Sequence, residues 1–90
     1  ILLNYNSLVK NLSTFNFARY ITINNDYTKA YIADGNKGLT IVDISNLQEP
    51  KIKENIYLND GFARCVKLND NETKAYVANS EGGFVEVDLN

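Results

Sequence analysis

The feature that most constrains the fold is an internal repeat with a period of 45 residues. When the sequence is shifted by 45 positions, residues 17–45 align with residues 62–90, and 12 of the 29 aligned pairs are identical. Unrelated segments of ordinary composition would share about two identities over this length. The longest identical runs are Phe17-Ala18-Arg19 with Phe62-Ala63-Arg64, and Thr28-Lys29-Ala30-Tyr31 with Thr73-Lys74-Ala75-Tyr76. The chain therefore contains two copies of one structural unit.

The residue pattern of each unit predicts short β-strands. The apolar residues are mostly β-branched or aromatic, and turn-forming residues interrupt them every six to nine positions. In the first unit we expect strands at about 18–24, 29–34, 39–44 and 51–58. In the second unit we expect the first three of these again, at about 63–68, 74–79 and 83–89. The fourth strand alternates apolar with polar residues and carries Lys51 and Lys53, which is typical of an outermost strand.

A strand of this fourth type is also expected before the first unit, at residues 8–14. There Leu8, Asn11 and Leu12 match Ile52, Asn55 and Ile56, with one residue deleted afterwards. We therefore divide the chain into three parts. Residues 1–16 are the outer strand of a preceding or shared unit, residues 17–61 are the first repeat, and residues 62–90 are the second repeat without an outer strand of its own.

Composition and charge exclude several classes of function. The net charge is −2, the pI is near 4.9, and arginine occurs only at positions 19 and 64, which is unsuited to a nucleic-acid phosphate surface. No run of about 18 apolar residues is present to span a membrane. The chain has no His, Met or Trp and one cysteine, Cys65, which we expect to be a packed strand residue. We predict no metal site, no cofactor and no catalytic residues in this segment.

Several runs of the first repeat resemble the LVIVD-repeat family, which is related to the YVTN-type propeller repeats. The resemblance rests on Ala30-Tyr31-Ile32-Ala33-Asp34-Gly35, on residues 38–46 (GLTIVDISN), on Gln48-Glu49-Pro50, and on the returning Gly61-Phe62-Ala63-Arg64. Leu47 and Glu86 depart from the family pattern. The resemblance implies an all-β fold in which the chain forms two four-stranded antiparallel blades of a β-propeller. It also implies a bacterial or archaeal protein outside the cytoplasm: periplasmic, secreted or at the cell surface.

Two blades are too few to close a propeller, which typically has four to eight. We therefore expect additional blades as partners, either from the same longer chain or from identical subunits assembled in a ring. We favour the longer chain, because the sequence begins at Ile1 and not at Met.

Arg19 and Arg64 are the candidate ligand-binding residues. Each opens the innermost strand of its unit, which in a propeller lies near the mouth of the central channel. Guanidinium groups there would bind carboxylates, phosphates or sulfated sugars through forked hydrogen bonds. The alternative is that each arginine ties one blade to the next. Asp43 and Asp88 likewise either cap a turn or bind a cation, and turn capping is the simpler interpretation.

Three further patterns have a structural and a functional interpretation. The oxygen-rich runs at 24–26 and 69–71 suit either turns or calcium, and we favour turns. Residues 34–38 (DGNKG) predict a tight turn, because a phosphate-binding loop would be followed by a helix. Tyr31 and Tyr76 are expected to pack within the blades and not to form a sugar-stacking platform.

We predict a non-catalytic binding or structural module of a secreted or cell-surface propeller that mediates protein or glycan interactions, without nucleic acid. The alternative is a fragment of a propeller enzyme, a hydrolase or lyase, whose active site lies at the axial mouth. Such a site would use unrepeated polar residues from several blades, whereas Arg19 and Arg64 recur at equivalent positions.

Overall fold

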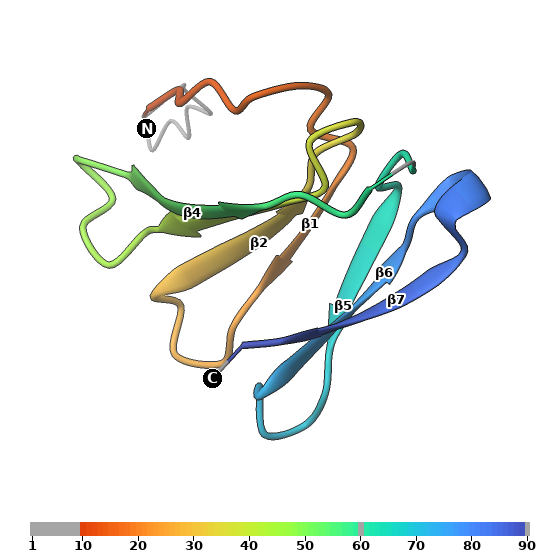
Figure 1. The fold of residues 1–90 in the computed structure, drawn as a ribbon. Coiled ribbons are helices and arrows are strands. Elements are labelled where there is room, and N and C mark those ends of the chain that lie inside the picture. Colours follow the sequence, from red (N-terminus) through yellow and green to blue (C-terminus); the bar gives the residue numbers. More distant parts are fainter. Residues whose placement is uncertain (1–9, 60, 90) are drawn as a thin grey trace, which may run out of the picture.

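In the computed structural model, which describes residues 10–59 and 61–89, the chain is all-β (Figure 1). The strands of the first repeat are β1 (Tyr20–Ile23), β2 (Lys29–Ala33), β3 (Leu39–Asp43) and β4 (Lys51–Ile56). Those of the second are β5 (Cys65–Leu68), β6 (Lys74–Ala78) and β7 (Phe84–Asp88), with one 3-10 turn, η1 (Ser80–Gly82), between β6 and β7. The all-β prediction and the seven strands expected in the two repeats are confirmed.

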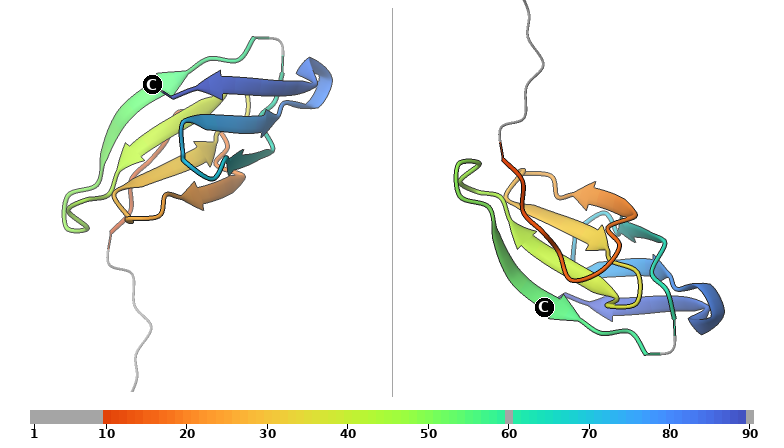
Figure 2. Two further views of the ribbon diagram at one scale, coloured as in Figure 1. Left: turned by 90° about the horizontal axis from the view of Figure 1, so that it is seen from below. Right: turned by 90° about the horizontal axis from the view of Figure 1, so that it is seen from above.

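The strands form two antiparallel sheets, in the order β1-β2-β3-β4 and β5-β6-β7. The sheets lie one over the other, with β5 against β1 and β2, and their outer strands diverge (Figures 1 and 2). Their assembly with further blades into a propeller stays a prediction. Within the described residues, no helix has the length and apolar character needed to cross a membrane.

Each sheet has two faces, which the pairing register defines. The front face of the first sheet is directed at the second sheet and carries Tyr20, Thr22, Tyr31, Ala33, Leu39 and Ile41. Its back face carries Ile21, Ile23, Ala30, Ile32, Thr40 and Val42. At positions 45 residues later, the second sheet has the front face Cys65, Lys67, Tyr76, Ala78, Phe84 and Glu86, and the back face Val66, Leu68, Ala75, Val77, Val85 and Val87.

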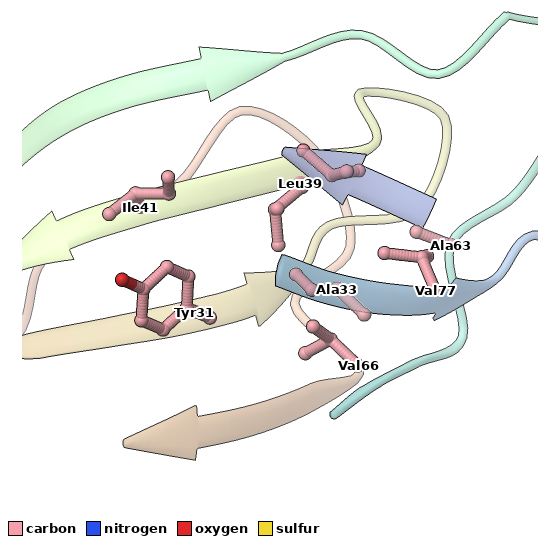
Figure 3. Close-up of a cluster of buried hydrophobic side chains, with 9 residues drawn as sticks. Tyr31, Ala33, Leu39, Ile41, Ala63, Val66 and Val77 are labelled. Atoms are coloured by element: carbon pink, nitrogen blue, oxygen red, sulfur yellow. The ribbon is translucent and has the colours of Figure 1, made fainter. Parts of the chain in front are cut away.

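The hydrophobic core lies between the front face of the first sheet and the back face of the second. In Figure 3, Val66 and Val77 of the second sheet lie beside Ala33 and Leu39 of the first, and all four are fully buried. Alternation along the strands produces this core, because successive side chains point to opposite faces. The front face of the first sheet and the back face of the second sheet are therefore buried against each other.

The fourth strand departs from simple alternation. A register shift between Ile41 and Val42 places Ile52 opposite Val42, whereas Ile56 lies opposite Leu39. Because Leu39 and Val42 are on opposite faces of β3, the two isoleucines of β4 serve different faces. A β-bulge that inserts one residue into the ladder causes this switch.

The strand expected at residues 8–14 is not formed in its described part, residues 10–14, and its first two residues lie outside the described ranges. A strand needs a partner edge, and this segment instead runs across the first sheet on the side away from the second (Figure 2). Its end is bound by Asp34, whose carboxylate accepts hydrogen bonds from the Thr14 hydroxyl (2.8 Å) and the N–H groups of Phe15 (3.0 Å) and Asn16 (3.2 Å). The assignment of residues 1–16 to another blade stays a prediction.

The equivalent of Asp34 in the second repeat is Asn79, and it binds the equivalent segment. The Asn79 amide nitrogen donates to the carbonyl oxygens of Leu58 (2.8 Å) and Asn59 (3.4 Å). Both residues are almost completely buried at the end of the second strand of their repeat. The same position therefore fixes the incoming chain in both repeats, once through an acceptor and once through a donor.

Candidate functional site

The two Phe-Ala-Arg triplets occupy equivalent backbone positions immediately before the innermost strands β1 and β5. The N–H of Arg19 donates to the Ala33 carbonyl and the N–H of Arg64 to the Ala78 carbonyl, each at 2.9 Å. These bonds extend the first ladder of each sheet by one residue. Because β1 and β5 lie against each other, the two triplets meet at one end of the molecule.

The ring of Phe62 is the centre of this meeting point. The guanidinium carbon of Arg19 lies 5.7 Å from the Phe62 ring centroid, and that of Arg64 lies 5.5 Å from it. The Phe17 ring is tilted by 35° against Phe62, with the centroids 6.1 Å apart. Both guanidinium groups are within cation–π range of one ring. We call Phe17, Arg19, Phe62 and Arg64 the aromatic–arginine cluster.

The cluster presents positive charge at the surface. Both arginines are exposed, and in residues 10–59 and 61–89 neither guanidinium forms an ion pair or a side-chain hydrogen bond. A guanidinium that stacks on a ring keeps its N–H edge available for a planar anion. Arg19 also reaches from the first repeat to Phe62 of the second, so the geometry fits a tie between repeats as well. Ligand binding by the two arginines stays a prediction.

A surface pocket of about 410 Å³ adjoins the cluster and shares Phe62 with it. Its other lining residues come from the turn after β2, the link from β4 to β5, and η1: Asn36, Tyr57, Gly61, Ser80 and Glu81. The lining combines two aromatic rings with an amide, a hydroxyl and a carboxylate. Such a mixture of apolar surface with a few polar groups is typical of small-ligand sites.

Asp43 caps a turn, as the simpler interpretation of the sequence predicted. Its carboxylate accepts hydrogen bonds from the Ser45 hydroxyl (2.7 Å) and the Ser45 N–H (2.9 Å). The hydroxyl bond, followed by the N–H bond, lowers the pKa of Asp43 below its usual value. Asp88 lies at the equivalent end of β7, exposed and opposite Lys74 in the register, and its role stays a prediction.

The oxygen-rich runs form the turns between the first two strands of each repeat. The Asn24 side-chain oxygen accepts from the N–H groups of Thr28 and Lys29, both at 2.9 Å, and the Asp26 carboxylate accepts from the Thr28 hydroxyl at 2.6 Å. In the second repeat, Asn69 and Asn71 accept the equivalent hydrogen bonds from Thr73 and Lys74. The turn interpretation is confirmed for these side-chain oxygens.

The run at residues 34–38 is also a turn, and it joins the sheets. Gly35 (φ 56°) and Gly38 (φ 80°) adopt the left-handed backbone that glycine favours. Gly35 exchanges two backbone hydrogen bonds with Ala63 of the second repeat, one from Gly35 N (3.3 Å) and one from Ala63 N (2.9 Å). Asp34 in the same turn is fully buried and also accepts the Thr40 hydroxyl at 2.8 Å. The tight turn predicted for residues 34–38 is confirmed.

The two repeated tyrosines differ in their surroundings. Tyr31 belongs to the core, as predicted, and its pKa is raised first by burial and then by the charges of Glu72 and Asp26. Tyr76 is half-buried and stacks on Phe84 with ring centroids 5.6 Å apart, on the front face of the second sheet, which no described part of the chain covers. Cys65 is a half-buried residue of β5, in agreement with its prediction as a packed strand residue.

Sequence reasoning singled out the two arginines and missed the ring between them. Phe17 and Phe62 are part of the same repeated triplets, so the signal was present. Each phenylalanine precedes its arginine by two residues. If the two triplets meet in the fold, their rings and guanidinium groups are therefore expected to lie close together. The pocket beside Phe62 combines residues from three separate connections, and no spacing in the sequence indicates it.

Comparison with known proteins finds a family to which the first repeat is similar. The family model described as LVIVD repeat matches residues 17–57, which include β1 to β4 and the first residue after β4. Searches of curated proteins and of solved structures found no match. The match agrees with the resemblance that the sequence motifs indicated, and residues 17–57 are similar to an LVIVD repeat.

Proposed function

We propose that this repeat module is a non-catalytic binding module and that the aromatic–arginine cluster, with the adjoining pocket, binds its ligand. The observation that carries the proposal is the pair of guanidinium groups over the single ring of Phe62. Stacking restricts both side chains before a ligand arrives, which reduces the entropy that binding must overcome. Their N–H edges remain accessible.

The chemistry of the cluster favours a carboxylate as the group recognised. A guanidinium forms two parallel hydrogen bonds to a carboxylate, and charge-assisted bonds of this kind are the strongest polar contacts available. The pocket next to it adds Tyr57 and Phe62 as apolar surfaces and Asn36 and Ser80 as hydrogen-bonding groups. An acidic glycan built from uronic-acid units has both features, because its rings have apolar faces and hydroxyl edges.

The setting of the module is part of the same proposal. Resemblance to LVIVD repeats supports a protein at the cell surface, in the periplasm or secreted, in which this chain forms part of a propeller. Further blades come from a longer chain or from identical subunits, and residues 1–16 contribute an outer strand to one of them. In that arrangement the cluster lies on the axial side of the assembly.

The experiment is a calorimetric titration of the 90-residue chain with a uronic-acid oligosaccharide. We expect Arg19→Ala and Arg64→Ala each to weaken binding about tenfold, the loss of one charge-assisted pair. Arg19→Lys keeps the charge but removes the fork, so we expect it to bind more weakly than the unaltered chain. The matched control is Lys51→Ala, which removes the same charge from an exposed position on β4.

Two comparisons decide between specific and general attraction. A neutral oligosaccharide of the same length should bind at least tenfold more weakly than the uronic-acid one. A polyglutamate peptide tests acidic protein as the source of the carboxylate, and tighter binding of the peptide would replace the glycan in the proposal. Equal weakening by Lys51→Ala, or no binding of any acidic ligand, would refute the site.

A further inference from the structure

We propose that a second pocket, between the two sheets, binds a free α-amino acid with an apolar side chain. The pocket has a volume of about 430 Å³ and is lined by residues of both repeats. Its lining has no residue in common with the aromatic–arginine cluster or with the pocket beside Phe62. The site therefore goes beyond the proposed binding of acidic glycans.

The floor of this pocket is part of the front face of the first sheet. It consists of Tyr31 of β2, Ile41 of β3 and Ile56 of β4, which also belong to the core or pack against it. The second sheet contributes Leu89, the residue directly after β7, which packs against the same core. These side chains give the pocket an apolar interior that suits an aliphatic group.

The lining also carries charges of both signs. Lys29 of β2 and Lys53 of β4 are positive, whereas Glu54 of β4 and Glu72 of the turn between β5 and β6 are negative. In the part of the chain that the structure describes, no ion pair joins any of these four side chains. Opposite charges that share a pocket without pairing with each other are available to a ligand that carries both signs.

Comparison of the repeats shows that the unpaired lysine is specific to the first repeat. The equivalent of Lys29 is Lys74, whose ammonium nitrogen lies 3.7 Å from the carboxylate of Glu86. The equivalent of Glu86 is Ile41, in the floor of the pocket. Isoleucine at this position deprives Lys29 of the ion pair that Lys74 has, and it makes the floor apolar.

The hydroxyl group of Tyr31 is the strongest indication of a ligand. Only 5% of Tyr31 is exposed, and its hydroxyl forms no hydrogen bond with the described residues. No fully enclosed polar side-chain atom of these residues lacks a partner, so the hydroxyl must reach the open space of the pocket. In Figure 3 its oxygen is directed away from Ala33 and Leu39. A buried tyrosine thus presents a polar group to whatever occupies the pocket.

The surroundings of Tyr31 define where each end of the ligand binds. Burial raises the pKa of Tyr31, and the charges of Glu72 and Asp26 raise it further, so the hydroxyl stays a donor at neutral pH. Lys29 lies two residues before Tyr31 on the same face of β2. The Lys29 ammonium and the Tyr31 hydroxyl therefore bind the ligand carboxylate, and Glu72 binds the ligand ammonium.

An α-amino acid fits this lining better than the alternatives. Its carboxylate and ammonium are attached to one carbon atom, and its side chain extends to the apolar floor. A dicarboxylate or a diamine would leave one sign of the pocket charge unpaired. An apolar segment of another chain would bury charged side chains without partners, which is costly.

The experiment is a calorimetric titration of the 90-residue chain with L-leucine and two probes that each lack one charge. The probe 4-methylpentanoate is leucine without its amino group, and 3-methylbutylamine is leucine without its carboxylate. We expect L-leucine to bind with a Kd below about 1 mM and each probe to bind at least about tenfold more weakly. A weaker Kd for L-leucine, or a probe that binds as tightly as L-leucine, would overturn the proposal.

The Tyr31 hydroxyl is tested by Tyr31→Phe, which leaves the ring in the core. We expect this variant to bind L-leucine about tenfold more weakly, the loss of one hydrogen bond. The matched control is Tyr76→Phe, the same change at the equivalent position outside the pocket, which should leave binding unchanged. Unchanged binding by Tyr31→Phe, or equal weakening by both variants, would contradict the site.

The two charge assignments are separated by the probes. Lys29→Gln should weaken L-leucine and 4-methylpentanoate about tenfold and leave 3-methylbutylamine unchanged. Glu72→Gln should weaken L-leucine and 3-methylbutylamine instead, and its amide oxygen can still accept the Asn25 N–H that Glu72 binds. Lys37→Gln, in the exposed turn after β2, is the charge control. A variant that weakens both probes equally would indicate a change in the fold and overturn its assignment.

Discussion

Leu39 and Phe84 occupy the same position in the two repeats and differ completely in burial. Leu39 lies against Val66 and Val77 of the second sheet, whereas Phe84 lies on a face that no described part of the chain covers. The larger apolar side chain is thus the exposed one. Burial here is decided by the neighbouring sheet and not by the residue, as in other repeat proteins whose stability resides in the contacts between units.

The largest effect is expected from truncating this pair of residues. Leu39→Ala removes a fully buried side chain and leaves a cavity between the sheets, which should lower the free energy of unfolding by about 3 kcal/mol. Phe84→Ala removes more apolar area from an exposed face and should change it by less than about 0.5 kcal/mol. Urea denaturation measures both values.

Similar losses of unfolding free energy for Leu39→Ala and Phe84→Ala would contradict the idea that the neighbouring sheet decides burial and stability at this position. A large loss for Phe84→Ala would mean that the stacked rings of Tyr76 and Phe84 stabilise the second sheet on their own. A second pair gives an independent test: Val66 and Ile21 occupy equivalent back-face positions in the two repeats, and Val66 is buried whereas Ile21 is exposed. Val66→Ala should therefore lower the free energy of unfolding more than Ile21→Ala.

An intermediate effect is expected from exchanging the two residues that hold the incoming chain. Asp34→Asn places an amide nitrogen against the N–H group of either Phe15 or Asn16, which donate to different oxygens of the carboxylate. Asn79→Asp places a carboxylate against two carbonyl oxygens. Each exchange introduces the residue that the other repeat has at this position. Each should lower the free energy of unfolding by about 1–3 kcal/mol, because a buried polar group loses its partner. Urea denaturation again provides the measurement.

Thr40→Val serves as a control for the first exchange, since it removes one of the four donors to Asp34 and leaves the incoming chain bound. Thr40→Val should lower the free energy of unfolding by less than Asp34→Asn does. If either exchange were neutral, the polarity of the incoming backbone would not be what selects Asp34 in one repeat and Asn79 in the other.

The smallest effect is expected on acidification, and it should be confined to one repeat. Asp26 holds the first turn, and the Thr28 hydroxyl bond lowers its pKa from 3.8. A lowered pKa in the folded state means that the carboxylate stabilises the turn fully above pH 3.8, and that this contribution is lost as the pH falls through the lower value. Its equivalent, Asn71, does not titrate.

Amide chemical shifts measured by NMR from pH 6 to 2 would follow this difference. The Thr28 amide should shift with the titration of Asp26, whereas the Thr73 amide should shift much less. Asp26→Asn should remove the Thr28 response and make the two turns alike. Equal responses of Thr28 and Thr73 would indicate a global acid transition and contradict the local explanation.

The sequence was sufficient to predict the strands because each obeys a local rule. β-branched residues alternate between turns, and the bonds of Asp43 and Asn24 to their own turns depend on neighbours a few residues away. What the sequence did not indicate depends on distant segments. The binding of Thr14 at Asp34, the pocket beside Phe62 and the bulge opposite Val42 each require the sheets to be in place first.

The Gly35–Ala63 bridge makes the contact between the sheets observable on its own. Each N–H donates to a carbonyl of the other repeat, and neither belongs to the ladder of a named strand. Hydrogen exchange at Ala63 therefore has two routes, global unfolding or separation of two intact sheets. If its exchange is faster than that of Val66 in β5, the protection of Ala63 gives the free energy of separating the two sheets, and the difference from Val66 gives the additional free energy of global unfolding. A single amide then reports how cooperatively the two repeats unfold.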